Sequence, residues 1–274
     1  MPPVDNGALS RLARAAGDGD SAALEEIIAA VRDDVYRLAL RMLWYPDDAE
    51  DATQEALIRI MTRIGSYRGE AAFRTWAYRV AANHILNWRH SRVEQENLNF
   101  RRYGEQLVEG LTDPDTTTPD AGLLVEEVKL GCTLGMLLCL DRDHRLAYLL
   151  SDVFDIRSSD AAYICATTAA AFRKRASRAR AQLRHFVGDH CGLVTEAAPC
   201  RCDRRVTAAI QNGRVQPDHL HFAGGVDPGS AISEMEQLHD LASLMRNHPE
   251  YQAPEAVTTA IRTVIKSGKY KLLE

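Results

Sequence analysis

Long hydrophobic runs are missing from this 274-residue sequence, and aromatic residues are few, at 7%. No apolar run approaches the roughly 20 residues that a membrane-spanning helix needs. The first ten residues also lack the basic and then apolar layout of a secretory signal peptide. We therefore expect a cytoplasmic protein that has no membrane partner.

Cysteine is present, but not in the pattern of a disulfide framework. The chain has only six cysteines, and a reducing compartment together with an ample core makes disulfide staples unnecessary. A cysteine with a specific task is therefore expected to be a free thiol or a metal ligand.

Catalytic motifs are also missing. The sequence has no phosphate-binding loop, no H-E-x-x-H and no G-x-S-x-G. The 46% of hydrophobic residues is nevertheless enough for one or two cores. We expect a protein of two compact domains that is not an enzyme.

The charge is strongly blocked along the chain. A net charge of −5 and a pI near 6.0 would by themselves argue against a nucleic-acid partner. However, residues 47–55 hold five acids and no base, and residues 68–92 hold five arginines and one acid. Residues 104–127 hold seven acids and no base, and residues 173–184 hold six bases and no acid. Such blocks predict several surfaces with different partners.

Apolar residues repeat with the period of amphipathic helices. Val35, Leu38 and Met42 mark one helix, and Asp47 is the expected N-cap of a second that runs to about residue 65. Further helices are expected at residues 73–88, 123–138, 143–154, 159–166, 168–187 and 254–268, and from about residue 233. No strand-like alternation of comparable length is present, so the predicted fold class is all-α.

Two segments show how these helices are grouped. Residues 93–122 lose the hydrophobic period and are rich in acids, Thr, Pro and Gly, which predicts a flexible acidic linker. The short helices between residues 143 and 187 are closely spaced, and the last is basic. This layout is typical of a helix-turn-helix.

Five stretches carry a resemblance to a known family. Residues 47–55 (Asp-Asp-Ala-Glu-Asp-Ala-Thr-Gln-Glu), the sequence Tyr67-Arg68-Gly69 and residues 73–83 resemble region 2 of bacterial RNA polymerase sigma factors of the extracytoplasmic-function (ECF) group. Residues 140–150 and 170–180 are similar to region 4 of the same group. The resemblance covers about residues 20–92 and 123–187.

The resemblance implies an architecture and a function. It implies a region 2 helical bundle at residues 1–92, a linker at 93–122, a region 4 helix-turn-helix domain at 123–187 and a mostly helical extension at 188–274. A sigma factor binds core RNA polymerase and directs promoter recognition and melting. Region 2 then reads the minus-ten element and region 4 the minus-thirty-five element.

Acidic side chains supply the expected polymerase contact. Asp47, Asp51 and Glu55 share one helix face, with Gln54 beside them. A solvated acidic face is the alternative. The resemblance instead implies docking on the coiled coil of the largest polymerase subunit, with the flap region as a further polymerase contact.

Aromatic, basic and amide side chains mix in residues 73–92. Aromatic rings can stack on unpaired bases, arginines can hold the backbone and asparagines can read base edges. Core packing is the alternative, above all for Phe73 and Trp88. The resulting minus-ten set is Arg74, Trp76, Tyr78, Arg79, Asn83, Asn87 and Arg89.

The basic helix supplies the expected contact with the minus-thirty-five element. Its candidate residues are Arg173, Lys174, Arg175 and Arg178, with a solvated basic face as the alternative. The family tends to have a small polar residue and Val where this chain has Ala170, Ala171 and Phe172, which leaves its base preference open. The acidic linker is either a soluble tether or, as the resemblance implies, a polyanion that threads toward the polymerase cleft.

The extension has three clustered cysteines. Cys191, Cys200 and Cys202 form C-x8-C-x-C. Thiolates with nearby histidines suit zinc or copper, but the spacing matches no common zinc finger, so a thiol switch or ordinary core cysteines remain alternatives. Cys132, Cys139 and Cys165 lie among apolar neighbours and are expected to be core. No cofactor is otherwise required.

Two other functions stay open at this point. One is a free-standing helix-turn-helix regulator that binds duplex DNA without polymerase. The other is a metal- or redox-sensing DNA-binding protein that uses the three cysteines of the extension. The sequence also leaves open the promoter, the inducing signal and whether a separate anti-sigma protein binds.

Overall fold

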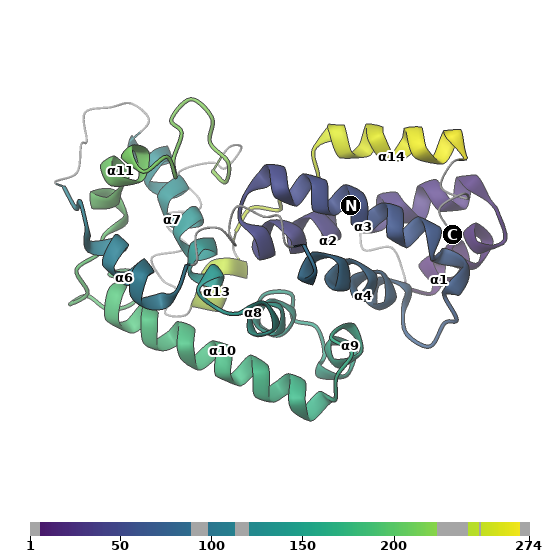
Figure 1. Cartoon of the computed structure of the whole chain (residues 1–274), viewed down its shortest axis with the longest axis horizontal. Helices are drawn as coiled ribbons and strands as arrows, with labels where there is room; N and C mark the ends of the chain where they lie inside the picture. Colours follow the sequence, from purple (N-terminus) through teal and green to yellow (C-terminus); the bar gives the residue numbers. More distant parts are fainter. Residues whose placement is uncertain (1–5, 89–97, 113–120, 224–240, 247, 269–274) are drawn as a thin grey trace. The chain divides into compact units, whose positions relative to one another are not determined.

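The computed structural model describes residues 6–88, 98–112, 121–223, 241–246 and 248–268 (Figure 1). The described residues form helices and no strand, with one isolated β-bridge between Cys191 and Cys200. The all-α prediction is therefore confirmed. Among the described residues, no helix is long and apolar enough to cross a membrane.

The chain divides into two compact units. The first contains Met1–Glu94, Ile156–Lys174 and Glu250–Glu274, and the second contains Gln95–Asp155 and Arg175–Pro249. The extension is thus shared between the units. The boundaries predicted at residues 92, 122 and 187 do not coincide with this division, and they stay a prediction about functional regions.

The first unit is built on three packed helices, α2 (Ser21–Leu43), α3 (Pro46–Thr62) and α4 (Phe73–Leu86). Its other helices are α1 (Asn6–Gly17), η1 (Ile64–Ser66), α9 (Ser158–Ile164) and α14 (Glu255–Ser267). Helix α3 packs on α2 and α4, and α14 packs on α2 and α3 (Figure 1). The core contains Leu38, Leu57 and Phe73, all fully buried.

Local sequence sets where α2 and α3 begin. Asp20 caps α2, because its Oδ1 accepts hydrogen bonds from the Ala22 and Ala23 amides at 2.9 and 3.1 Å. The prediction that Asp47 caps α3 is wrong. Tyr45 is the N-cap and Pro46 occupies the first turn, where its missing amide costs nothing. Asp47 lies in that first turn as well, where the helix dipole favours a carboxylate.

The helix-turn-helix elements are present. Helix α9 is followed by a tight turn in which Ala166 has a φ of 47°, and then by α10 (Ala169–His190). Thr168 Oγ1 accepts a hydrogen bond from the Ala171 amide at 3.2 Å, which caps α10. Arg157 is the N-cap of α9 and forms an ion pair with Asp160.

The second unit surrounds α7 (Ala121–Leu138). Its other elements are α6 (Phe100–Val108), α8 (Arg142–Tyr148), the π-turn η2 (Leu149–Val153), α11 (Cys202–Gln211), α13 (Leu241–Arg246) and the later part of α10. The buried Arg145 donates hydrogen bonds to the Leu137, Leu138 and Leu140 carbonyls, which fixes the turn between α7 and α8.

The predicted linker is not irregular throughout. Residues Phe100–Val108 form α6, whose buried Tyr103 donates a hydrogen bond to the Cys132 carbonyl at 3.1 Å. Arg205 of the extension donates to the Glu109 carbonyl at 2.6 Å. This part of the linker is therefore attached to the second unit and does not act as a free tether.

A buried carboxylate attaches the extension to α7. Glu127 is 1% exposed and accepts hydrogen bonds from the amides of His221, Phe222 and Ala223 at 2.7 to 2.9 Å. Three charge-assisted bonds compensate for burying the charge. The extension up to residue 223 is thus an integral part of the second unit.

Candidate functional site

Helix α3 carries an exposed acidic strip, which we define as Asp47, Asp51 and Glu55. Gln54 lies beside the strip and is half-buried. The opposite face consists of small residues that are fully buried against the neighbouring helices, namely Ala49, Ala52, Thr53 and Ala56. The face predicted from the sequence is therefore brought together as expected, with its carboxylates turned to solvent.

The electrostatics of this surface are those of a negative patch. Burial raises the pKa of Glu50, and the nearby Asp47 and Asp51 raise it further. Burial likewise raises the pKa of Tyr36 to about 12, with added contributions from Glu50 and Asp47. Because these carboxylates disfavour additional negative charge, the strip favours a cationic partner.

Four of the residues predicted to contact the minus-ten element are engaged within the first unit. Trp76 is 8% exposed and packs against Phe73 and Tyr67, with ring centroids 5.5 and 5.7 Å apart. Burial raises the pKa of the enclosed Tyr78 hydroxyl. Arg74 forms an ion pair with Asp34 of α2. Core packing, the alternative interpretation of this helix, therefore describes Trp76, whereas Tyr78 is half-buried with an enclosed hydroxyl.

The fourth residue, Arg79, lies over the Tyr163 ring of α9 at 4.5 Å. This cation–π contact occupies the guanidinium with a partner inside the same unit. Arg79 is therefore not presented as a free phosphate contact.

The exposed part of α4 is its C-terminal end. Asn83 and Asn87 are exposed, and Asn87 Nδ2 donates to the Asn83 carbonyl at 2.7 Å. Arg89 lies outside the described residues. The preceding loop exposes Arg68 and Gly69, and Gly69 has a φ of 78°, which glycine adopts without strain. Among the described minus-ten candidates, the exposed ones are therefore Asn83 and Asn87, and the preceding loop adds the exposed Arg68 and Gly69.

The cations of α10 separate into two groups. Arg173, Lys174 and Arg178 are exposed. Arg175 lies 3.5 Å from Asp143, and Arg180 is held by Asp152 through two hydrogen bonds of 2.6 and 2.9 Å. The two groups have different uses, because Arg180 is fixed within the second unit whereas the exposed cations can reach a phosphate or a base.

The three cysteines of the extension lie in one neighbourhood with a fourth. Burial raises the pKa of Cys132 on α7 to about 12, and the nearby Cys200 and Cys191 thiols raise it further. Burial also raises the pKa of Cys202. The nearby Cys132, Cys191 and Cys200 thiols raise it further. We call these four residues the thiol cluster. The assignment of Cys132 to an ordinary core missed its neighbours, because the contact between α7 and α11 is tertiary.

The thiol cluster is not arranged as a finished metal shell. All six cysteines are free thiols. In the parts of the chain that the structure describes, no three His, Cys, Asp or Glu side chains are placed to hold a metal ion together. Four thiols nevertheless form the donor set that a structural zinc ion prefers. A metal at the cysteines thus stays a prediction.

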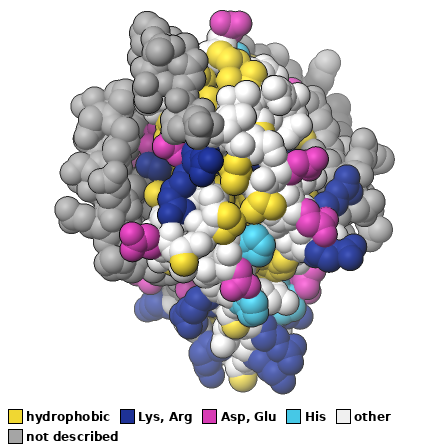
Figure 2. All heavy atoms as spheres, turned by 90° about the vertical axis from the view of Figure 1, so that its left-hand side faces the viewer, with side chains coloured by type: hydrophobic (Ala, Val, Ile, Leu, Met, Phe, Trp, Pro, Cys, Tyr) yellow, Lys and Arg dark blue, Asp and Glu magenta, His cyan; other side chains and the backbone are white. Residues whose placement is uncertain are grey.

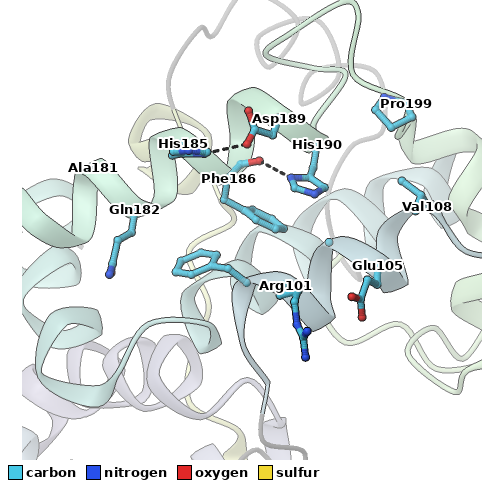
Figure 3. Close-up of a pocket in the computed structure, with 12 residues that line it drawn as sticks. Arg101, Glu105, Val108, Ala181, Gln182, His185, Phe186, Asp189, His190 and Pro199 are labelled. Carbon is cyan, nitrogen blue, oxygen red and sulfur yellow. Dashed lines mark hydrogen bonds and ion pairs between the residues drawn. The ribbon is translucent and has the colours of Figure 1, made fainter.

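An open, mainly apolar groove of about 840 Å³ lies between α6 and the C-terminal part of α10 (Figure 3). Phe186 stacks on His190 with a centroid distance of 4.5 Å, and His185 pairs with Asp189 at 2.8 Å. A Cβ on Gly104 would lie 2.5 Å from His190 Nε2, so glycine permits this close approach. Sequence reasoning did not find this groove, because its two walls are about 80 residues apart in the chain.

Figure 2 shows how side chains of different types lie on one face of the molecule. On the face drawn in Figure 2, Lys and Arg side chains gather at the lower edge. Among the described side chains on that face, the hydrophobic ones form small groups.

Comparisons with known proteins agree with the motifs. The Sigma-70 region 2 family model matches residues 27–94, which include the acidic strip and α4. The chain is 32% identical over 180 residues to the ECF RNA polymerase sigma factor SigC of Mycobacterium tuberculosis, covering 64% of this chain and 89% of that protein. It is 28% identical over 177 residues to SigW of Bacillus subtilis, with 62% and 92% covered. It is 27% identical over 188 residues to SigE of Mycolicibacterium smegmatis, with 66% and 68% covered.

His84 on α4 offers a pH test of the packing beneath the strip. Its Nε2 lies 3.5 Å from Glu55 Oε2. Burial, and secondly Arg59, lowers its pKa to about 4 from an ordinary value of 6.5. The unfolded chain therefore takes up the proton first as the pH falls. The stabilisation is fully present above pH 6.5 and is lost between pH 6.5 and 4.

We expect His84→Gln to remove about 1–3 kcal/mol of the pH-dependent change in the free energy of unfolding between pH 6.5 and 4. Urea unfolding at several pH values in this window measures that change. The matched variant His219→Gln, at an exposed histidine of the second unit, should retain the wild-type slope. An unchanged slope in His84→Gln would show that the imidazole is not buried in this way.

Proposed function

The chain belongs to the ECF group of RNA polymerase sigma factors and directs transcription initiation, and we propose that three surfaces divide this work. The acidic strip contacts core polymerase, the C-terminal end of α4 with its preceding loop contacts the minus-ten element, and α10 contacts the minus-thirty-five element. The observation that carries the proposal is the exposed acidic strip within the residues matched by the family model.

The polymerase contact rests on charge and shape. Three carboxylates at successive turns of one exposed helix face favour a basic, elongated partner, for which the coiled coil of the largest polymerase subunit is the proposed one. The flap region is the proposed partner of the region 4 domain. The proposed site of action is the cytoplasm, where core polymerase and promoter DNA are found. Phosphoryl transfer is carried out by the polymerase, and no catalytic step is assigned to this chain.

The promoter contacts use fewer residues than the sequence alone suggests. For the minus-ten element we retain Asn83 and Asn87, because they are exposed at the end of α4. Amide side chains can recognise base edges through paired donors and acceptors. For the minus-thirty-five element we retain the exposed Arg173, Lys174 and Arg178 of α10.

The alternative of a free-standing duplex-binding regulator accounts for α9 and α10 alone. It gives no role to the acidic strip, whose charge would repel DNA. Tight, specific binding of the isolated chain to duplex promoter, equal with and without core polymerase, would favour that alternative.

The first prediction from the proposed function tests the acidic strip. The variant Asp51→Arg with Glu55→Arg should lose co-purification with core polymerase, at least about 100-fold in affinity, because two attractive contacts become repulsive. Helicity and the unfolding midpoint should remain close to wild type, because both side chains are exposed.

A charge-matched control uses exposed acids outside the strip. Glu196→Arg with Asp218→Arg makes the same change in net charge within the second unit. This control should bind core polymerase normally. If the strip variant and the control variant bind core polymerase with the same affinity, the acidic strip is not part of the interface.

The second prediction separates the two promoter contacts. Arg173→Ala with Arg178→Ala should weaken upstream duplex binding by the polymerase complex and lower its salt slope by about 1 for each phosphate that is no longer neutralised. Asn83→Ala should leave upstream binding unchanged and slow open-complex formation. Arg11→Ala with Arg101→Ala, which removes two exposed cations elsewhere, should affect neither step. Failure of both test variants at the same step would contradict the division.

We also propose zinc as the metal of the thiol cluster, in preference to copper, because four thiol donors match structural zinc sites. The four thiols lie close enough to influence one another's pKa values, which places four sulfur donors in one neighbourhood. Closing the shell requires side-chain rotation, because no three ligands already meet among the described residues.

The third prediction follows from this donor set. Protein purified under reducing conditions should contain about one equivalent of zinc, and Cys132→Ser and Cys200→Ser should each lower the zinc content and the unfolding midpoint. Cys165→Ser, outside the thiol cluster, should retain the metal. Metal-free wild-type protein would show that these thiols have only a packing or redox role.

A further inference from the structure

The C-terminal segment 251–267 lies on α2 and on α3, the helix that carries the acidic strip. Helix α14 packs on α2 and α3 within the first unit (Figure 1). The segment lies outside the region 2 family match, which ends at residue 94. It therefore adds a layer to the unit that the matched region does not supply.

An apolar seam holds α14 in place. Val257, Ile261 and Ile265 repeat at i, i+4 and i+8, and their exposures are 2, 3 and 7%. A helix with this pattern uses one stripe as its docking face. Its other face is polar and exposed, with Thr259 and Thr263 among its residues.

Polar contacts set the register of the segment. Arg32 Nη1 donates to Thr258 Oγ1 at 2.8 Å, and the Ala253 amide donates to Asp33 Oδ1 at 3.1 Å. Arg41 lies over the Tyr251 ring, 5.5 Å from its centroid. Arg32, Asp33 and Arg41 all lie on α2, and each contacts a particular residue of the segment. The segment is therefore held in one register, which apolar packing alone would not fix.

The charge of α14 resembles the charge expected of the polymerase partner. Arg262 Nε lies 3.4 Å from Glu25 Oε1 of α2 and its Nη1 lies 3.8 Å from Glu255 Oε1 of α14 itself, and the exposed Lys266, which follows one turn later, leaves the helix with two cations and one acid. The helix thus brings cations to the unit whose acidic strip favours cations. A second basic helix approaching the same unit would meet like charge from α14.

The acidic strip is too small to form a polymerase interface alone. From Asp47 to Glu55 it extends about 12 Å along α3, an area of the order of 100–200 Å². Specific interfaces bury about 800 Å² per partner. A partner that grips the strip must therefore extend over the neighbouring elements, and α14 is one of these because it packs on the same helix.

We propose that the segment 251–267 is an intramolecular competitor of core polymerase, which occupies part of the α2–α3 surface in the free chain and is displaced when polymerase binds. This rests on the proposed function of the acidic strip. The partner that fits the released surface is a basic amphipathic helix, and the chain carries a version of such a helix at its own C-terminus.

The test compares full-length variants for affinity to core polymerase. Val257→Asp with Ile261→Asp undocks α14 without altering α2 or α3. If α14 is docked nine-tenths of the time in the free chain, undocking raises the apparent affinity about 10-fold. The matched control, Thr259→Asp with Thr263→Asp, adds the same charges to the exposed face and should bind like wild type.

A milder variant keeps the test valid if the double aspartate perturbs folding. Thr258→Val removes the acceptor of the Arg32 hydrogen bond at nearly constant volume and should raise affinity by a smaller factor in the same direction. Equal or weaker binding by both undocking variants would overturn the proposal, since α14 would then be a structural layer or part of the interface.

Hydrogen exchange of the wild-type chain gives an independent readout. Amides of α14 should be protected in the free chain and lose protection in the polymerase complex. Retained protection in a formed complex overturns the competitor role alone. If no complex forms with wild type or any variant, the proposed function of the acidic strip fails instead, so the two failures are distinguishable.

Discussion

The close packing of α3 against α2 and α4 is the constraint on which the remaining surfaces depend. Small side chains at Ala49, Ala52 and Ala56 are fully buried and allow the helices to approach closely. Because helical geometry fixes the opposite face, this inward alanine seam directs Asp47, Asp51 and Glu55 to solvent. The same seam positions α4, and therefore the asparagines at its exposed end.

The second unit depends on buried polar groups as well as apolar packing. Glu127 holds three backbone amides of the extension, and Arg145 holds three carbonyls at the end of α7. Both groups give partners to backbone polar atoms in irregular segments, namely residues 221–223 and the end of α7 with the turn that follows. The extension is thereby bound to α7, and the cysteines of the extension reach Cys132.

Local periodicity predicted most helices, because amphipathic stripes and turn residues are local signals. It predicted α3, α4 and the turn between α9 and α10. The charge blocks predicted the acidic and basic surfaces as separate features. It missed α6, because this short helix, with its buried Tyr103 and Leu107, lies in the span 93–122, which was predicted to be a linker for its overall content of acids, Thr, Pro and Gly. It also offered Trp76 to DNA, although the ring completes the core with Phe73. Partners from other helices decide such positions, and a single segment does not contain them.

Site-specific photocrosslinking from α3 tests the central assignment most directly. A photoreactive amino acid in place of Gln54 lies beside the acidic strip and should crosslink to the largest subunit of core polymerase in the assembled complex. The same group in place of the exposed Val108, in the second unit, provides the comparison. Strong crosslinking to the largest subunit from position 54 is the predicted result. A complex that forms and transcribes, yet yields no crosslink from position 54, would contradict the assignment of this surface to polymerase.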